Sequence, residues 1–252
     1  MAGRKSLRSV APTGPKVVLF DMDDTLFDHS MTCRAALGRM RREHPFLRSR
    51  SVDDLTREYL RLLGANFAEV ALGRRSKESA RSERFVSLAF WCGHPIEDPA
   101  GSALSQQYRS LYQELRRPVS GAPEFLRRIE GRTQIAVVTN NTVAEQTEKL
   151  DFLGLQRAVH LLVTSEEVGV AKPDPGIFRA ALERARAAPD QAVMVGDVWA
   201  SDIVGARAAG IRSIWFNRFR LPRPEECSVP EFASFRATRQ LERLLGMGPI
   251  AA

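Results

Sequence analysis

The pattern of apolar and polar positions predicts five short buried strands. Each is a run of mostly apolar residues, nearly continuous rather than alternating, which is typical of strands covered on both faces of a sheet. The runs are residues 16–21, 134–140, 159–165, 191–197 and 212–217. Helical patterns separate the later runs, and this alternation predicts a parallel sheet with right-handed crossover connections.

Several helix ends are also predicted in the second half of the chain. Thr142 and Glu145 have the spacing of a capping box, before a helix that stops near Gly154. Asp174 and Pro175 predict the start of the next helix. A last helix is expected over residues 235–245, after a proline- and glutamate-rich surface loop at 222–230.

The first interval between strands breaks the alternation. From residue 28 to residue 118 only helical patterns occur, such as Leu55, Tyr59 and Leu62 on one face. The stretch is too long for a single crossover, so we expect a helical module inserted into an α/β core. The expected divisions are a disordered basic tail at 1–15, a core at 16–28 and 118–252, and an all-helical cap at 29–117.

Composition fits this picture. The 252 residues, 44% of them hydrophobic, suffice for one large core with a smaller second module. More than half of the net charge of +7 comes from residues 1–16, which contain Arg4, Lys5, Arg8 and Lys16 and no acidic residue. Because the rest of the chain is nearly balanced, a nucleic-acid partner is not expected, although the role of the tail stays open.

Targeting and redox signals point to the cytoplasm. No apolar run is long enough to span a membrane, and the tail lacks the apolar segment of a signal peptide. Cys33, Cys92 and Cys227 are far apart and odd in number, which fits neither a zinc site nor a disulfide framework. We therefore predict a cytoplasmic protein with no membrane association.

Polar residues whose side chains could take part in catalysis or ligand binding follow the predicted strands. They are Asp21 and Asp23 after the first, Thr139 and Asn140 after the second, Lys172 after the third, and Asp197 with Asp202 after the fourth. Ligands of open parallel sheets bind beyond the carboxyl ends of the strands, so these side chains are expected at one edge. An oxygen-rich cluster without His or Cys favours Mg²⁺.

This inventory suits phosphoryl transfer. With Mg²⁺ bound, one carboxylate can attack phosphorus and form an aspartyl-phosphate. A second carboxylate two residues later lies on the same side of an extended segment, where it can protonate the leaving alkoxide and then activate water. Thr139, backbone N–H groups near Asn140, and Lys172 could neutralise the charge of the phosphoryl group.

Four ordered motifs, DMDDT, VVTNN, KPDP and GDVWASD, resemble those of the haloacid dehalogenase-like superfamily of hydrolases, in the subgroup with a helical cap after the first strand. The resemblance covers about residues 16–217 and implies a Rossmann-like core of five strands in the order 5-4-1-2-3. The run from VVTNN through KPDPGIF also resembles the nucleotidase and sugar-phosphate phosphatase branch.

The resemblance also implies roles for single residues. Asp21 would be the nucleophile and a metal ligand, and Asp23 the general acid and base that also offers its backbone carbonyl to Mg²⁺. Thr139, Asn140 and Lys172 would bind the phosphoryl group. Asp197 would be a metal ligand, and Asp202 would act behind the ligands or through a bound water.

Three neighbouring residues receive no catalytic role. Asp24 is expected to be an exposed acid in a turn, and Asp28 with His29 to mark the hinge into the cap.

The predicted function is a Mg²⁺-dependent phosphatase for a small phosphomonoester, a nucleotide or a sugar phosphate, acting through an aspartyl-phosphate. One alternative is a 2-haloacid dehalogenase, but the dehalogenases of this superfamily lack an acid two residues after the nucleophile and Asp23 is present. Another is a non-catalytic binding protein on the same scaffold. A phospho-accepting receiver module is disfavoured by the length of the chain and the helical insertion. No motif identifies the substrate, the cap residues that contact it, or the oligomeric state.

Overall fold

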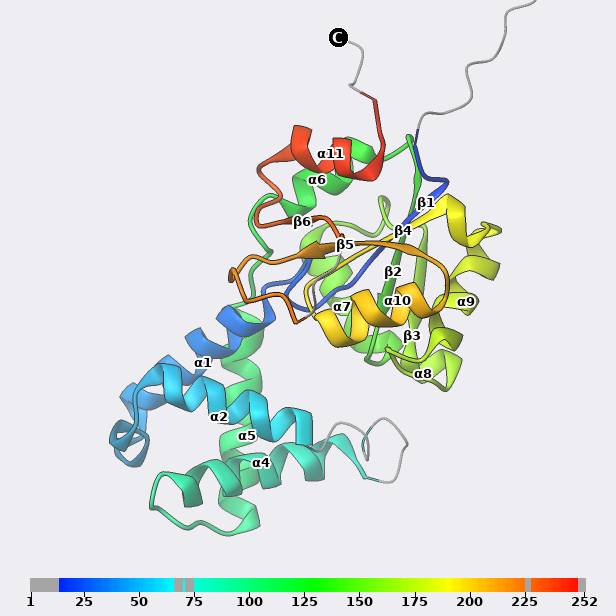
Figure 1. The fold of residues 1–252 in the computed structure, drawn as a ribbon. Coiled ribbons are helices and arrows are strands. Elements are labelled where there is room, and N and C mark those ends of the chain that lie inside the picture. The colour runs from blue at the N-terminus through cyan, green and yellow to red at the C-terminus, as the bar shows by residue number, and fades with distance from the viewer. Residues whose placement is uncertain (1–13, 66–69, 71–74, 225–227, 249–252) are drawn as a thin grey trace, which may run out of the picture.

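The computed structural model describes residues 14–65, 70, 75–224 and 228–248 and confirms the predicted parallel α/β fold (Figure 1). The sheet order is β3-β2-β1-β4-β5-β6, and every neighbouring pair is parallel. The predicted tail lies almost entirely outside the described residues. The strands are β1 (Val17–Phe20), β2 (Gln134–Thr139), β3 (Leu161–Thr164), β4 (Ala192–Gly196), β5 (Arg212–Phe216) and β6 (Glu231–Phe232).

The sixth strand, β6, corrects the expectation of five. It extends the sheet beyond β5, where the Trp215 N–H donates to the Pro230 carbonyl and the Asn217 N–H donates to the Phe232 carbonyl. The strand has only two residues, which is too short to show any hydrophobic period. Its position directly after the proline-rich stretch also hid it, because proline cannot donate to a ladder.

Both faces of the sheet are covered by helices, as the continuous apolar runs predicted. Along β1, Val18 and Phe20 pack on one face with residues of α6 (Ala122–Ile129), α7 (Val143–Leu153) and α11 (Thr238–Leu245). Val17 and Leu19 pack on the other face with residues of α9 (Pro175–Ala185) and α10 (Val204–Ala208). Alternate side chains thus enter opposite cores, and all four are fully buried.

The described part of residues 29–117 contains helices and no strand. It forms a group beside the sheet (Figure 1) with its own apolar cluster, which includes Leu37, Leu55, Phe85 and Leu88. The main helices are α1 (His29–Glu43), α2 (Val52–Ala65), α4 (Lys77–Trp91) and α5 (Asp98–Glu114), with a short 3₁₀ turn at Pro45–Ser49. We call this segment the helical insertion.

The insertion leaves the sheet and returns to it at one place. The Asp28 N–H donates to the Arg117 carbonyl over 3.0 Å, and the Val119 N–H donates to the Leu26 carbonyl over 2.9 Å. An antiparallel bridge between Phe27 and Pro118 completes this contact. None of the helices in the described residues is long and apolar enough to cross a membrane.

Not every predicted helix end is correct. Asp174 caps α9 as expected, since its carboxylate accepts from the Gly176 N–H over 2.7 Å. The capping box at Thr142 and Glu145 is wrong, because other partners compete for both side chains. The Thr142 hydroxyl accepts from Lys77 Nζ over 2.8 Å, and Glu145 lies 3.7 Å from Lys149 Nζ. The last helix begins at Thr238, later than predicted.

Candidate active site

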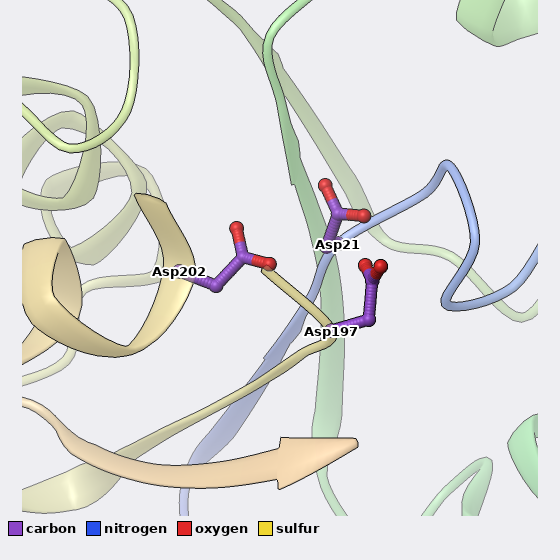
Figure 2. A group of neighbouring side chains, drawn as sticks. All are labelled: Asp21, Asp197 and Asp202. Carbon is purple, nitrogen blue, oxygen red and sulfur yellow. The ribbon is translucent and has the colours of Figure 1, made fainter. Parts of the chain in front are cut away.

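The carboxyl ends of the strands bring three aspartates together, as predicted for this edge of the sheet. Asp21 follows β1, Asp197 follows β4, and Asp202 lies in the π-helical turn Trp199–Ile203 that comes next (Figure 2). Each offers a carboxylate oxygen, and these oxygens all lie within 4.8 Å of one another. The cluster joins residues almost two hundred positions apart because β1 and β4 are neighbours in the sheet.

Lys172 is the cation of this cluster. Its ammonium donates to Asp21 Oδ1 over 2.5 Å and to Asp202 Oδ1 over 2.7 Å, and the side chain is almost completely buried. Two contacts hold its backbone, because Asn140 Oδ1 accepts from the Lys172 N–H and Asn140 Nδ2 donates to the Lys172 carbonyl. The side chain of Asn140 thus positions the lysine, while Thr139 ends β2 nearby and is 2% exposed.

Asp202 is held by protein donors on both oxygens. The Val198 N–H donates to Oδ2 over 3.0 Å, and the Ser201 hydroxyl donates to Oδ1 over 3.2 Å alongside Lys172. Gly196 makes room for this carboxylate, because a Cβ there would lie 2.4 Å from Asp202 Oδ2. These contacts fit Asp202 as the anchor of Lys172 more closely than as a direct ligand.

The electrostatics of the cluster favour an added cation. Burial raises the pKa of Asp21 to about 7, with Lys172 opposing the shift and Asp202 adding to it. Burial beside Asp21 and Asp202 also raises the pKa of Asp197 well above its usual range. Three crowded carboxylates share one ammonium, and every atom of the group that could ligate a metal is an oxygen. Such a set fits a hard divalent cation such as Mg²⁺.

Asp23 points to different partners, although it lies only two residues after Asp21. Lys149 Nζ donates to its two oxygens over 2.6 and 2.8 Å, and Gln146 Nε2 donates over 3.2 Å. Burial would raise the pKa of Asp23, but Lys149 and, more weakly, His29 hold it below its ordinary value. Asp23 is therefore ionised in this arrangement.

Comparison with known proteins identifies the family. The sequence pattern of the haloacid dehalogenase-like hydrolases matches residues 15–210. The chain belongs to this family. Residue 15 precedes β1 and residue 210 precedes β5, so the match includes the insertion and every polar residue of the cluster.

Two relatives of this hydrolase are phosphatases by name. It is 31% identical over 230 residues to pyrimidine 5'-nucleotidase YjjG of Escherichia coli K12, across 90% of this chain and 96% of the relative. It is 32% identical over 236 residues to phosphoserine phosphatase of Thermus thermophilus, across 84% and 93%. The solved HAD-hydrolase YfnB of Bacillus subtilis, described as bound to magnesium, shares the fold with a TM-score of 0.72 at 23% identity, covering 92% and 99% of the chains. These findings support the predicted hydrolase class and phosphatase function.

Asp24 corrects a prediction made for this hydrolase. It lies in a turn as predicted, but it is not exposed, because its carboxylate accepts from the Ser30 N–H over 2.8 Å and from Arg218 over 3.1 Å. Its backbone has φ 65°, in the left-handed region that aspartate tolerates. Arg218 also donates to Asp28 over 2.6 Å, so one guanidinium ties both acids at the start of the insertion.

A cavity of about 340 Å³ lies next to the cluster. The core lines it with Asp23, Asn140 and Lys149, and the insertion lines it with side chains that include Tyr59, Arg84 and Tyr108. His29, expected to mark only a hinge, also lines it, and its Nδ1 lies 2.7 Å from the Tyr112 hydroxyl. The cavity has the size of a small-molecule site, and it reaches Asp23, two residues after Asp21 of the cluster.

Sequence reasoning missed Lys149 and Gln146, which hold Asp23. A signal for both exists in α7, where they share a face with the buried Leu150 and Leu153. A lysine on an apolar helix face requires a buried counter-charge, and Asp23 is that partner. The aspartate alone gave no indication of which helix would supply it.

Proposed function

We propose that this hydrolase is a Mg²⁺-dependent phosphatase that cleaves a small phosphomonoester through an aspartyl-phosphate. The observation that carries the proposal is the division of labour between two neighbouring acids. Asp21 belongs to the buried carboxylate cluster with Lys172, whereas Asp23 faces the cavity with a separate lysine. This division supports Asp21 as the acid that attacks phosphorus and Asp23 as the acid that handles the proton of the leaving group.

Each residue of the edge has a defined task in this proposal. A carboxylate oxygen of Asp21 attacks phosphorus, the bond to the leaving alkoxide breaks, and the phosphoryl group is held by the Thr139 hydroxyl, Lys172 and backbone N–H groups near Asn140. Water then attacks the phosphorus of the aspartyl-phosphate, the bond from phosphorus to the Asp21 oxygen breaks, and inorganic phosphate leaves, which regenerates the Asp21 carboxylate. Lys172 balances negative charge in both steps, and Asp202 and Asn140 fix its position.

Magnesium would be held by the carboxylates of Asp21 and Asp197 and by the backbone carbonyl of Asp23. When bound, it neutralises charge on the phosphoryl oxygens and on the crowded acids. The Thr25 hydroxyl donates to Asp197 Oδ1 over 3.0 Å and thereby orients this ligand.

Asp23 would serve both half-reactions as an acid and then a base. Its ion pair with Lys149 favours the ionised form, which is the form that takes a proton from the attacking water. To protonate the leaving alkoxide it must first take up a proton from solvent, a form that the ion pair with Lys149 disfavours. We assign the helical insertion as a cap domain, residues 29–117, which covers a core formed by residues 16–28 and 118–252. In this proposal the cap selects the leaving group.

The names of the relatives support a nucleotide, an amino-acid phosphate or a sugar phosphate as the substrate, since they include a pyrimidine 5'-nucleotidase, a phosphoserine phosphatase and a glyceraldehyde 3-phosphate phosphatase. Solved L-2-haloacid dehalogenases share the fold at 17% and 18% identity, which carries no argument about the reaction. We expect no dehalogenation, because the proton-handling pair of Asp23 and Lys149 suits an alkoxide leaving group rather than a halide.

The test is hydrolysis of 4-nitrophenyl phosphate with Mg²⁺ or with a chelator, by wild type, Asp21→Asn and the control Asp53→Asn. Asp53 is an exposed acid of α2 in the insertion. We expect activity only with Mg²⁺, a loss of roughly 10³-fold or more in Asp21→Asn, and no change in the control. Melting curves should also show stabilisation of wild type by about 2.7 kcal/mol at a hundredfold excess of Mg²⁺ over its Kd. Full activity in the chelator or in Asp21→Asn would refute the proposal.

A further inference from the structure

Arg84 differs from every other buried charged side chain in the described part of the protein. The others each form an ion pair with an opposite charge: Asp21, Asp28, Lys149, Lys172, Asp202 and Glu242. Arg84 is only 7% exposed and has no acidic partner among the described residues. A buried guanidinium without a counter-charge is costly, so its retention calls for an anion that the described residues do not supply.

The contacts of Arg84 hold it in place without neutralising it. One terminal nitrogen donates to the Tyr59 hydroxyl over 2.9 Å, and the guanidinium carbon lies 5.0 Å from the centroid of the Tyr59 ring. The buried Nε atom has no hydrogen-bond partner, and neither has the buried hydroxyl of Tyr108. Both residues line the cavity, so two buried polar atoms without a hydrogen-bond partner belong to residues of its wall.

The other cations of the cavity are differently placed. Arg116 lies 2.8 Å from Glu148, and Arg81 lies 3.8 Å from Glu145, so both are neutralised by acids of α7. Arg109 is exposed to solvent. Arg84 is buried beside tyrosine rings and the apolar Ala80, where low polarity strengthens an ion pair.

We propose that Arg84 binds a second anionic group on the leaving-group part of the substrate. This inference rests on the proposed phosphatase function and narrows the substrate class. With the phosphoryl group at the sheet edge, the leaving group extends past Asp23 into the cavity, and its carboxylate or second phosphate pairs with Arg84. The Tyr108 hydroxyl donates to the same group. The planar guanidinium can bind either anion through two parallel hydrogen bonds.

The test uses substrate pairs that differ by one anionic group. Phosphoserine and phosphoethanolamine differ by a carboxylate, and fructose 1,6-bisphosphate and fructose 6-phosphate differ by a phosphate. A third pair, 4-carboxyphenyl phosphate and phenyl phosphate, has a better leaving group. We expect wild type to prefer the more anionic member of at least one pair by about 10- to 100-fold in kcat/KM. The pair in which the preference occurs shows whether Arg84 binds a carboxylate or a phosphate.

Three variants assign this preference to Arg84. In Arg84→Met the preference should fall to within about threefold, through loss on the anionic substrate alone. In Arg84→Lys, which keeps the charge but loses the planar fork, an intermediate preference is expected. The control is Arg57→Met, at an exposed arginine of α2, which should behave as wild type. A preference unchanged in both Arg84 variants, or absent in wild type for all pairs, would overturn the inference.

Thermal stability separates substrate binding from a purely structural role. Without substrate, Arg84→Met removes an uncompensated buried charge, so its melting temperature should equal or exceed that of wild type. A clear drop, with substrate preference retained in Arg84→Lys, would assign Arg84 to packing against Tyr59 and refute the proposal.

Failure of the inference is distinguishable from failure of the proposed function. If wild type hydrolyses 4-nitrophenyl phosphate with Mg²⁺ but never discriminates within the pairs, only the role of Arg84 is wrong. If no phosphomonoester is hydrolysed, the phosphatase function is wrong and the inference falls with it.

Discussion

The sheet edge and the cavity wall of the insertion differ in how they accommodate buried charge. At the sheet edge, Lys172 lies 2.5 Å from Asp21 and 2.7 Å from Asp202, so these two buried acids share a cation supplied by the chain. In the insertion, Arg84 has only the hydroxyl and the ring of Tyr59. The chain thus supplies the counter-charge for the buried acids of the edge, whereas no described residue supplies one for Arg84 in the cavity wall.

Replacement of Lys172 gives the strongest test of this contrast. Lys172→Met leaves Asp21 and Asp202 buried without their cation, so we expect a loss of about 3–5 kcal/mol in the free energy of unfolding. The same change at Arg84 is expected to be neutral or stabilising. Chemical denaturation in a chelator measures both, with Lys16→Met at an exposed lysine as the control. Equal signs for the two variants would break the comparison.

Gly196 tests how tightly the edge is built. In Gly196→Ala the new Cβ would lie 2.4 Å from Asp202 Oδ2, so we expect a loss of about 1–3 kcal/mol and weaker hydrolysis as Lys172 shifts. The control is Gly64→Ala in α2, where nothing lies within 4 Å of the new atom. Because alanine favours a helix, the control should gain about 0.5–1 kcal/mol. A Gly196→Ala variant as stable and active as wild type would show that the edge is looser than described.

Glu242 provides a paired charge far from both sites and the smallest expected effect. It is buried and contacts Arg128 at 3.1 Å and Arg132 at 2.7 Å. Burial would raise its pKa, but hydrogen bonds from the two arginines hold the pKa below the ordinary 4.5. Because these arginines are partly exposed, Glu242→Gln should cost only about 1 kcal/mol at pH 7.

The pH dependence of this effect has a defined sign. A carboxyl group with a lowered folded-state pKa stabilises the protein fully above its unfolded pKa of about 4.5, and this contribution disappears as the pH falls through the folded value. The stability difference between wild type and Glu242→Gln should therefore be constant near neutrality and shrink below about pH 4.5. Exposed Glu130→Gln should change stability little at either pH. A difference that does not shrink at all as the pH falls below 4.5 would contradict the assigned ion pairs.

The sheet edge was predictable because strand pattern and chemistry coincide there. Asp21, Thr139 and Asp197 each follow a buried run or end it, and parallel strands deliver such residues to one edge whatever their separation in sequence. The family resemblance added the strand order and the residue roles. Strand order and family are confirmed, while the residue roles stay predictions for the experiments above.

The cavity wall was not predictable for a physical reason. Helix surfaces carry arginines at many positions, and the sequence does not say which of them the tertiary packing will bury. Nothing in the sequence distinguishes Arg84 from Arg81 of the same helix, yet only Arg84 is buried against Tyr59. The predicted capping box at Thr142 is wrong for a similar reason, because Lys77, from a helix distant in sequence, donates a hydrogen bond to the Thr142 hydroxyl. Local patterns decide local structure only where no tertiary partner competes.

The contact between Phe27 and Pro118 has a consequence for the architecture of the chain. The insertion leaves the sheet and rejoins it at residues that pair with each other. Its two ends are therefore joined like those of a hairpin, whatever the length of the segment between them. The entropy of closing a loop grows only with the logarithm of its length, so a longer or shorter excursion costs the core little. A scaffold with such a junction can lengthen, shorten or exchange the inserted helices without disturbing the strands of the sheet.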